Sequence, residues 1–412
     1  MPKRFTVAAL TVLLAIATLV MPSLKAATAT AKPEELGFSS ERLERIAELM
    51  QHHIDAQTFS GAVTLVARNG RIAYFHAQGL MDIEAKKPMP KDGIFRIMSM
   101  TKPIVGTSVM MMIEEGKVRL TDPVSKFIPE FHGLKVAGGG PAERDITVRD
   151  LLTHTSGLMS GGASSGEARN VGAKPGEGLA QVLPRLAAVP LDFQPGTRWA
   201  YSAQYGFDTL VRIVEIASGM PFDRFAKQRI FDPLGMKDTF FYPTDGNPRV
   251  VTLYSRMDGA LKRQPNPPFM NGVYFSGGGG LFSTAEDYFQ FAQMLLNGGQ
   301  LNGKRLVSPR AVELMSSVFI PDTLPGRTPG EGYGLSMRVV SDPMKRNTFL
   351  SKGSFGWSGA YNTHFWVDPK EKIIGVMMTQ TSGLTDRGEI RNAFEDAVMQ
   401  ALVGNASTSG TN

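Results

Sequence analysis

Cysteine is absent from all 412 residues of the chain. This absence excludes disulfides, thiolate-bound zinc, a lipid-modified cysteine and a cysteine nucleophile. The histidines show no metal-ligand spacing, and we expect no metal site and no catalytic histidine. The chemistry of this protein must therefore come from oxygen and nitrogen groups.

An excess of charge is also missing from the sequence. The formal net charge is +6, and residues 1–29 hold Lys3, Arg4 and Lys25 but no acidic residue. Removal of these residues leaves a net charge of +3. A charge this small and dispersed does not favour nucleic acid as a partner.

Long hydrophobic runs are limited to the N-terminus. Lys3 and Arg4 precede an apolar run from Phe5 to Met21, which is followed by Pro22 and small residues. This order is typical of an export signal, so we expect cleavage near residue 29 and a periplasmic or secreted protein. An uncleaved anchor is the alternative, but the run is short for a bilayer span and no second one follows. We therefore expect no stable membrane insertion after signal removal.

Hydrophobic patterns predict a sheet built from both ends of the chain. A helix over 41–53 is followed by strands over 62–67 and 72–77, which the dipeptide Asn69-Gly70 joins as a hairpin. Near the other end, strands over 361–367 and 372–379 surround a turn, and an amphipathic helix covers 387–403.

The middle of the chain, up to about residue 265, has the pattern of helices and loops rather than strands. Helices are expected over 147–152, 179–186 and 205–218, with a mobile Gly/Ser-rich loop over 159–178. The predicted organisation is α/β of the α+β type, with an antiparallel sheet flanked by helices and an inserted helical domain. Its ranges are 1–29 (signal), 30–98 and 266–403 (sheet domain), 99–265 (helical domain) and 404–412 (disordered tail).

Ser99 and Lys102 form the single Ser-x-x-Lys of the chain. Residues three apart share one face of a helix, and Pro103 fits a helix only near its start. Ser99 is therefore expected at a helix N-terminus, where the partial positive charge favours a developing oxyanion. A buried lysine loses its hydration, which favours the neutral form that accepts a proton from serine. The spacing alone is equally compatible with a helix cap and a surface charge.

Two further stretches carry chemistry of the same kind. Tyr201 follows the turn at 195–197, and a tyrosine near a positive lysine could act as base for Ser99 and acid for the leaving group. Residues 353–360 place glycines before a predicted strand, where the backbone could approach a ligand and donate to an oxyanion. Each stretch is equally compatible with a structural role.

One rival nucleophile motif is present. Residues 162–166 match Gly-x-Ser-x-Gly around Ser164, but that elbow requires a preceding buried strand, and here it falls in a Gly/Ser-rich loop. His154 is interpreted as a helix-end or core histidine rather than a triad base. Neither residue is expected to be catalytic.

Taken together and in order, these stretches over about 34–403 resemble the serine β-lactamase and penicillin-binding protein superfamily, specifically its class C branch. Further similar stretches are Leu151–Leu158, Gly277–Thr284 and Phe365–Pro369. The resemblance implies that Ser99 is acylated, Lys102 activates it and Tyr201 is the general acid/base. It also implies an oxyanion hole formed by the N–H groups of Ser99 and Ala360.

The departures from the family pattern indicate the substrate. Tyr201-Ser202-Ala203 stands where the lactamases have Tyr-x-Asn, and Trp357-Ser358-Gly359 stands where they have Lys-Thr-Gly. The asparagine amide and the lysine cation that this chain lacks would contact a β-lactam. We therefore expect β-lactams to fit poorly as the main substrates. Trp-x-Gly resembles the family VIII carboxylesterases, with Trp357, Ser358 and Gly359 as substrate-binding residues.

The expected activity is hydrolysis of a small-molecule carboxylic ester of short to medium chain length through an acyl-enzyme on Ser99. It needs no metal or organic cofactor. A β-lactamase or a D-alanyl-D-alanine carboxypeptidase is the alternative within the superfamily. A non-catalytic binding or sensing domain with this fold is the alternative from another class.

Overall fold

The computed structural model describes residues 30–162, 164–167, 171–243, 246–265 and 272–404. The expected export signal and residues 405–412 of the expected tail lie outside these ranges. Within them, no helix has both the length and the hydropathy that a bilayer span requires.

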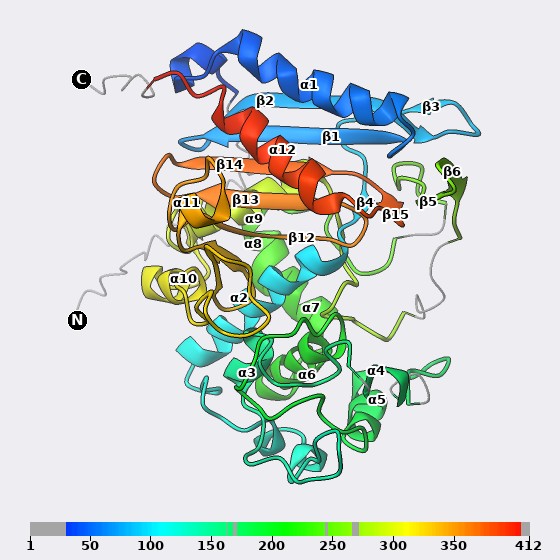
Figure 1. Ribbon diagram of the computed structural model, residues 1–412, viewed down its shortest axis with the longest axis vertical. Helices are drawn as coiled ribbons and strands as arrows, with labels where there is room; N and C mark the ends of the chain where they lie inside the picture. Colours follow the sequence, from blue (N-terminus) through cyan, green and yellow to red (C-terminus); the bar gives the residue numbers. More distant parts are fainter. Residues whose placement is uncertain (1–29, 163, 168–170, 244–245, 266–271, 405–412) are drawn as a thin grey trace, which may run out of the picture.

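An eight-stranded sheet with strand order β10-β11-β12-β13-β14-β1-β2-β3 forms one end of the molecule (Figure 1). Neighbouring strands in it are antiparallel. The early strands join the late ones where β1 pairs with β14, from Val63 opposite Met378 to Arg68 opposite Ile373. The strands are β1 (Gly61–Arg68), β2 (Arg71–Asp82), β3 (Lys87–Pro88), β10 (Glu331–Tyr333), β11 (Arg338–Val340), β12 (Phe355–Ser358), β13 (His364–Asp368) and β14 (Ile373–Met378).

The predicted hairpin between β1 and β2 is confirmed. Asn69 and Gly70 both have positive φ, at 51° and 77°, which the tight turn requires and these residue types tolerate. The expected strand over 361–367 begins only at His364, because Asn362 adopts a φ of 67° and turns the chain. A sheet built from both ends of the chain is therefore what the structure contains.

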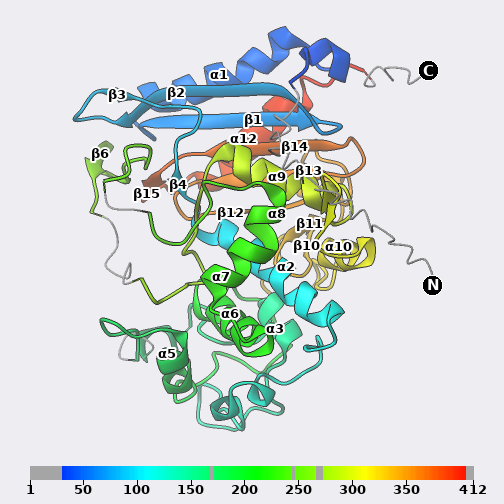
Figure 2. The same cartoon turned by 180° about the vertical axis from the view of Figure 1, so that it is seen from behind.

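Helices cover both faces of this sheet. The helices α1 (Ser40–Asp55) and α12 (Arg387–Met399) lie on one face, and α9 (Ala285–Leu296) lies on the other (Figures 1 and 2). Ser39 caps α1 by accepting a hydrogen bond from the N–H of Arg42, as expected of a serine before the first turn. The final helix ends earlier than the predicted residue 403.

Most of the remaining helices gather at the other end of the molecule and around α9 (Figure 2), whereas the short helix α11 (Pro343–Arg346) lies beside the sheet (Figure 1). The helix α2 (Thr101–Glu114) runs from the sheet into this region and packs on α6. The predicted boundaries of α5 and α6 match the structure. The others are α3 (Val148–Leu152), α4 (Ser164–Glu167), α5 (Leu179–Leu186), α6 (Tyr205–Ser218), α7 (Phe222–Ala226), α8 (Asp232–Leu234), α10 (Pro309–Met315) and α11 (Pro343–Arg346).

Strands also occur where helices and loops alone were expected, so that part of the prediction is wrong. The strands β5 (Tyr254–Met257) and β6 (Ala260–Arg263) form a hairpin, and β15 (Thr381–Ser382) pairs with β5 in parallel. The dipeptide Asp258-Gly259, with φ of 51° and 80°, is the turn signal that was overlooked. The division into a discontinuous sheet domain and a helical domain stays a prediction. Further short strands are β4 (Phe95–Arg96), β7 (Phe282–Ser283), β8 (Gln300–Leu301) and β9 (Lys304–Arg305).

Two buried apolar clusters hold the layers together. One cluster lies between the sheet and α1 with α12, and includes Phe38, Trp366 and Phe394. The larger cluster joins the other sheet face to α2, α6 and α9 through residues such as Ile104 and Phe289. Because α2 is buried along nearly its whole length, the turn that precedes it is rigidly placed between the sheet and the helical end.

Candidate active site

Ser99 lies in the short 3-10 turn of Met98–Met100 that joins β4 to α2. The predicted position at a helix N-terminus is therefore confirmed. Met98 just before it has a φ of 49°, a left-handed conformation that costs a non-glycine residue about 1 kcal/mol or more. The strained turn leaves Ser99 9% exposed at the edge of a cavity.

Lys102 is fully buried one turn further along, and its ammonium nitrogen contacts three oxygens. Nζ lies 2.6 Å from the carbonyl oxygen of Ala203, 2.8 Å from that of Gly278 and 3.2 Å from Oγ of Ser99. Two N–H groups serve the two carbonyls, so the third tetrahedral position faces Ser99. That position can hold either a proton or the lone pair, which suits a group that exchanges one proton with the serine.

Tyr201 approaches the same serine from the other side. Its hydroxyl donates to Oγ of Ser99 at 2.7 Å, and its ring centroid lies 5.0 Å from Nζ of Lys102. The irregular segment that carries Tyr201 is held by backbone bonds from Trp199 to Pro325 and from Ala200 to His154. The structure thus brings together the three residues that the sequence singled out, although Tyr201 lies 102 positions after Ser99.

His154 follows α3 and is buried, as predicted, in the core. Its Nδ1 accepts a hydrogen bond from the N–H of Ser202, and its ring centroid lies 4.7 Å from that of Tyr201. Burial, with the nearby positive charge of Lys102, lowers the pKa of His154 well below its ordinary 6.5. A neutral imidazole therefore supports the back of the Tyr201 ring. Sequence reasoning placed it in the core but missed this contact.

A buried aspartate supports one of the two carbonyl groups that hold Lys102, that of Gly278. Asp208 of α6 accepts hydrogen bonds from the hydroxyls of Tyr274 and Ser276 and from the N–H of Gly278. It thereby fixes the chain just where Gly278 offers its carbonyl to Lys102. Sequence reasoning did not single out Asp208, because nothing local distinguishes it from other helix carboxylates.

The end of β12 forms the opposite wall of the cavity. Its pairing with β11 stops at Gly356, so the outer edge of residues 357–360 is open. Gly359 lies so close to the serine turn that a Cβ there would be 2.3 Å from the carbonyl oxygen of Ile97. Among the described residues no acceptor binds the N–H of Ala360. This free N–H suits the predicted oxyanion role.

Trp357 makes this wall apolar. Its ring packs against those of Tyr201 and Tyr333 at centroid distances of 5.6 and 5.2 Å. A lysine at this position would instead place a positive charge beside Ser99. The indole therefore does not reproduce the carboxylate-binding corner that a lysine would form.

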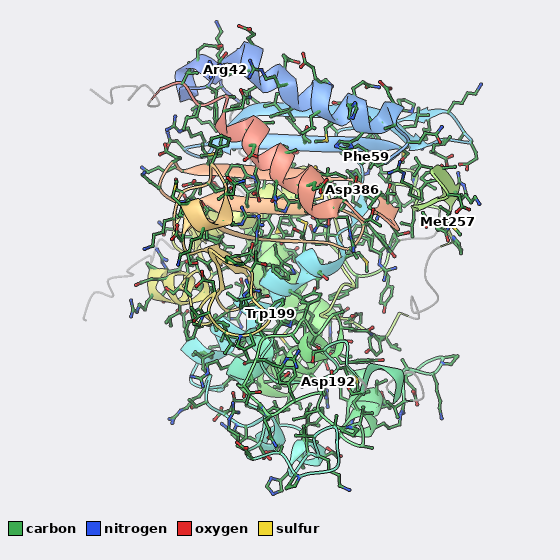
Figure 3. All side chains as sticks on the ribbon, viewed as in Figure 1. Arg42, Phe59, Asp192, Trp199, Met257 and Asp386 are labelled. Atoms are coloured by element: carbon green, nitrogen blue, oxygen red, sulfur yellow. The ribbon has the colours of Figure 1, made fainter. Side chains whose placement is uncertain are left out.

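Two arginines of α12, which sequence reasoning missed, hold the same peptide segment. Arg391 donates to the carbonyl of Gly359 at 2.6 Å, and Arg387 donates to that of Ala360 at 3.0 Å. The labelled Asp386 in Figure 3 marks the start of this helix beside the sheet. Burial, with Arg387 and Arg338 nearby, lowers the pKa of Arg391 to about 9, so it is still charged at neutral pH. Only the fold brings α12 to this point.

Because every peptide bond of the described chain is trans, the carbonyl of Gly359 and the N–H of Ala360 point in opposite directions. A charge-assisted bond from Arg391 to that carbonyl polarises the N–H on the other side. Arg391 thus orients and strengthens one predicted oxyanion donor without touching the reacting atoms.

The cavity that contains Ser99 has a volume of about 460 Å³. It extends around the open end of β12, from Tyr201 and Trp357 on one side to α12 on the other. All predicted substrate-binding residues line it. The complete lining is Ser99, Tyr201, Glu331, Arg338, Trp357, Ser358, Gly359, Ala360, Thr385, Arg387, Gly388 and Arg391.

Ser164 of the rival motif lies elsewhere. Its hydroxyl donates to Asp192 at 2.6 Å, and it begins the short helix α4 rather than following a strand. Figure 3 shows Asp192 further from the sheet than Trp199, within the helical end. Ser164 is therefore a structural residue of this loop, although Ala163 of the motif lies outside the described residues.

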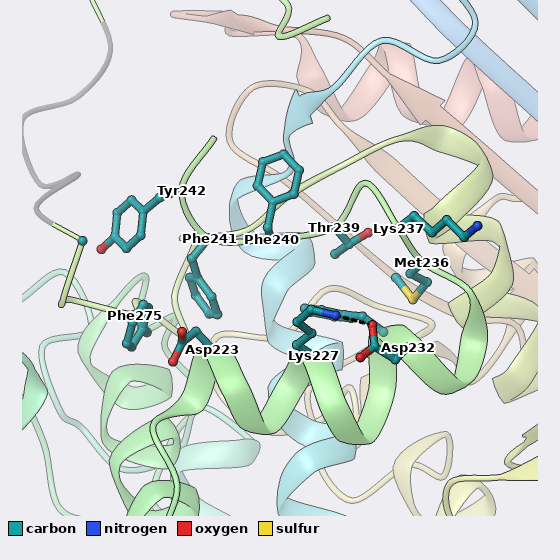
Figure 4. A pocket seen from close by; sticks show the side chains of 12 residues that line it. Asp223, Lys227, Asp232, Met236, Lys237, Thr239, Phe240, Phe241, Tyr242 and Phe275 are labelled. Atoms are coloured by element: carbon teal, nitrogen blue, oxygen red, sulfur yellow. Dashed lines mark hydrogen bonds and ion pairs between the residues drawn. The ribbon is translucent and has the colours of Figure 1, made fainter. Parts of the chain in front are cut away.

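A second cavity, of about 490 Å³, lies beside α7 and α8 and does not contain Ser99 (Figure 4). Phe241 and Phe275 lie beside Asp223 in it, while Lys227 pairs with Asp232. Within the described part of the chain, no group of three histidine or acidic side chains is arranged to hold a metal ion.

Comparison with known proteins gives a consistent result. The family model described as Beta-lactamase matches residues 46–400. The protein Rv1367c of Mycobacterium tuberculosis is 37% identical over 79% of this chain and 87% of its own length. Esterase EstB of Burkholderia gladioli is 32% identical over 82% and 90%. The structure of EstCE1, described as a hydrolase with promiscuous acyltransferase activity, superimposes with a TM-score of 0.76 at 28% identity, covering 88% of this chain and 99% of that one.

Proposed function

The chain belongs to the beta-lactamase family, and from this premise we propose that it is a serine hydrolase of small carboxylic esters with short to medium chains. The observation that carries the proposal is the position of Ser99 Oγ, within hydrogen-bond distance of both Lys102 and Tyr201. The apolar Trp357 wall supports an uncharged substrate. The similarity to Esterase EstB supports the same class.

Acylation begins when Ser99 loses its proton to the Lys102/Tyr201 pair and attacks the ester carbonyl carbon. The tetrahedral oxyanion accepts hydrogen bonds from the N–H groups of Ser99 and Ala360. As the carbon–oxygen bond to the alcohol breaks, the proton passes through Tyr201 to the leaving oxygen. The alcohol departs and the acyl group stays on Ser99.

Deacylation reverses the same proton path. Water loses a proton to the Lys102/Tyr201 pair, attacks the acyl carbon and releases the acid, while Ser99 recovers a proton. Arg391 keeps the Ala360 N–H oriented in both half-reactions.

A β-lactamase or D-alanyl-D-alanine carboxypeptidase remains the second candidate. The guanidinium groups of Arg387 and Arg391 favour it, because they bring positive charge to the cavity that sequence reasoning did not foresee. Both groups are engaged with backbone carbonyls, which weakens their claim on a substrate carboxylate. Measuring kcat/KM for nitrocefin and for p-nitrophenyl butyrate on one preparation decides which of the two candidate functions ranks first. A higher value for nitrocefin would reverse their order.

The test of the nucleophile compares two serines of the same fold. Ser99→Ala is expected to abolish turnover of p-nitrophenyl butyrate, whereas Ser164→Ala is expected to keep near-normal turnover. A fluorophosphonate probe should add its mass to the wild type and not to Ser99→Ala. Loss of activity in Ser164→Ala with retention in Ser99→Ala contradicts the assignment, and an unlabelled wild type favours a non-catalytic domain.

We also propose that the protein is exported and acts in the periplasm or outside the cell. The support is the order of charge, apolar run and small residues over 1–29. N-terminal sequencing of the mature protein tests the expected cleavage near residue 29.

A further inference from the structure

Ser358 belongs to a hydrogen-bonded chain that the proposed reaction does not use. It lines the cavity on the opposite face of β12 from Trp357, because successive strand residues alternate. Its Oγ lies 2.9 Å from Nδ1 of His364, the residue directly across on β13. Nε2 of His364 lies 3.0 Å from Oε1 of Glu395 on α12.

Both inner members of this chain are buried, with His364 0% and Glu395 1% exposed. Arg338 and Arg346 each pair with both Glu395 and Glu331, and Arg327 also pairs with Glu331, so three arginines already face these two carboxylates. A positive charge on His364 would have no counter-charge left. Burial lowers the pKa of His364 to about 4, although Glu395 opposes this. Burial also disfavours the charged form of Glu395, but Arg338, His364 and Arg346 outweigh it and lower its pKa to about 2.

The direction of each hydrogen bond follows from these charge states. Ionised Glu395 can only accept, so the one N–H of the neutral His364 ring lies on Nε2. Nδ1 then carries a lone pair and accepts the hydroxyl proton of Ser358. The oxygen of Ser358 is left with lone pairs toward the cavity and no proton to offer.

We propose that the buried His364–Glu395 pair fixes Ser358 as a hydrogen-bond acceptor and thereby selects esters that carry a hydroxyl or N–H donor, and no carboxylate, near the end of β12. This inference rests on the proposed ester hydrolysis and names its substrate class. Ser358 contacts the substrate, while His364 and Glu395 are positioning residues. A carboxylate there would meet lone pairs, or would take the Ser358 proton and leave Nδ1 of His364 buried without a donor, which costs about tenfold or more in affinity.

The experiment uses pairs of esters that differ by a methyl or hydroxyl group of similar size. Propyl butyrate is compared with 2-hydroxyethyl butyrate, and propyl 3-methylbutyrate with propyl 3-hydroxybutyrate, by pH-stat titration. The wild type is expected to prefer the hydroxylated member of at least one pair, and Ser358→Ala is expected to lower that ratio of kcat/KM about tenfold. Ser316→Ala is the matched control, since within the described residues the Ser316 hydroxyl bonds only to the carbonyl of Val312.

His364→Gln separates positioning from general damage. A glutamine can still donate to Glu395 but leaves the Ser358 proton free, so the hydroxyl preference should fall while turnover of carboxylate-bearing propyl hydrogen succinate rises relative to propyl butyrate. The double variant that carries both His364→Gln and Ser358→Ala should show no lower hydroxyl preference than Ser358→Ala alone. In case His364→Gln does not fold, the ring tautomer is read directly in the wild type by two-bond ¹H–¹⁵N NMR, with protonation on Nε2 alone as the expected result.

Unchanged ratios in Ser358→Ala for both pairs, or an Nδ1-protonated ring at pH 7, would overturn the inference while ester hydrolysis itself stands. If the wild type hydrolyses none of the four esters nor p-nitrophenyl butyrate, the proposed function fails instead. The two failures are therefore distinguishable.

Discussion

The substitution Gly278→Ala tests whether the two backbone carbonyls around Lys102 set the rate of acylation. A Cβ at this glycine would lie 2.6 Å from Cα of Gln204 and 2.9 Å from the carbonyl oxygen of Ala203. Both obstacles are backbone, so no side-chain rotation relieves them. The chain must move by about 0.8 Å to restore an ordinary contact of 3.4 Å.

A movement of this size separates the carbonyls of Ala203 and Gly278. The Lys102–Gly278 distance of 2.8 Å then approaches about 3.6 Å, which is no longer a hydrogen bond. A hydrogen bond to a charged group contributes about 1.5–3 kcal/mol, and its loss leaves Nζ of Lys102 free to turn from Ser99. We expect kcat to fall about 10- to 100-fold.

The assay is steady-state hydrolysis of p-nitrophenyl butyrate, with thermal unfolding followed by circular dichroism. Gly140→Ala is the control, because a Cβ there meets nothing within 4 Å. It should keep the wild-type kcat. If Gly278→Ala unfolds near the wild-type Tm and keeps kcat within twofold, the carbonyl pair does not position Lys102 and the reasoning is refuted.

Two further predictions concern α12 and the strands beside it. The unfolded chain protonates His364 below pH 6.5 and the folded chain only below about 4, so the free energy of unfolding should drop by about 3 kcal/mol as the pH falls from 6.5 to 4. Urea titrations over this pH range should show a smaller loss of unfolding free energy in His364→Gln than in the wild type. An equal loss in both proteins contradicts the lowered pKa of His364. Arg391→Met should lower kcat for p-nitrophenyl butyrate about tenfold with little change in KM, since it weakens the Ala360 donor only as charge develops on the oxyanion. A change confined to KM would show that Arg391 binds substrate instead.

Local signals in the sequence were sufficient for much of the fold. Helix α6 is recognised from its apolar period and from Gly219 at its end, and the β1–β2 hairpin from Asn69-Gly70. The β5–β6 hairpin has an equally local Asp-Gly turn, yet its strands are short, half exposed and completed by β15 from far along the chain. Short strands of this kind are specified by their partners more than by their own residues.

The sequence by itself determined how Ser99 and Lys102 stand relative to each other. The spacing to Lys102 and the position of Pro103 place serine and lysine on one face at a helix start, and this depends only on helix geometry. The resemblance to a known superfamily then added Tyr201 and the segment at 357–360. All of these predictions rest on local stretches of sequence.

Only the tertiary structure decided what surrounds that centre. Arg391 reaches the carbonyl of Gly359, and Glu395 reaches His364, because α12 packs across the sheet beside the open end of β12. The direction of these hydrogen bonds and the burial of their members depend on residues that are tens of positions apart, and no local pattern encodes them. The proposed nucleophile and its lysine thus lie within four consecutive residues, whereas the polarity of the cavity beside them arises from the packing of a helix on a sheet.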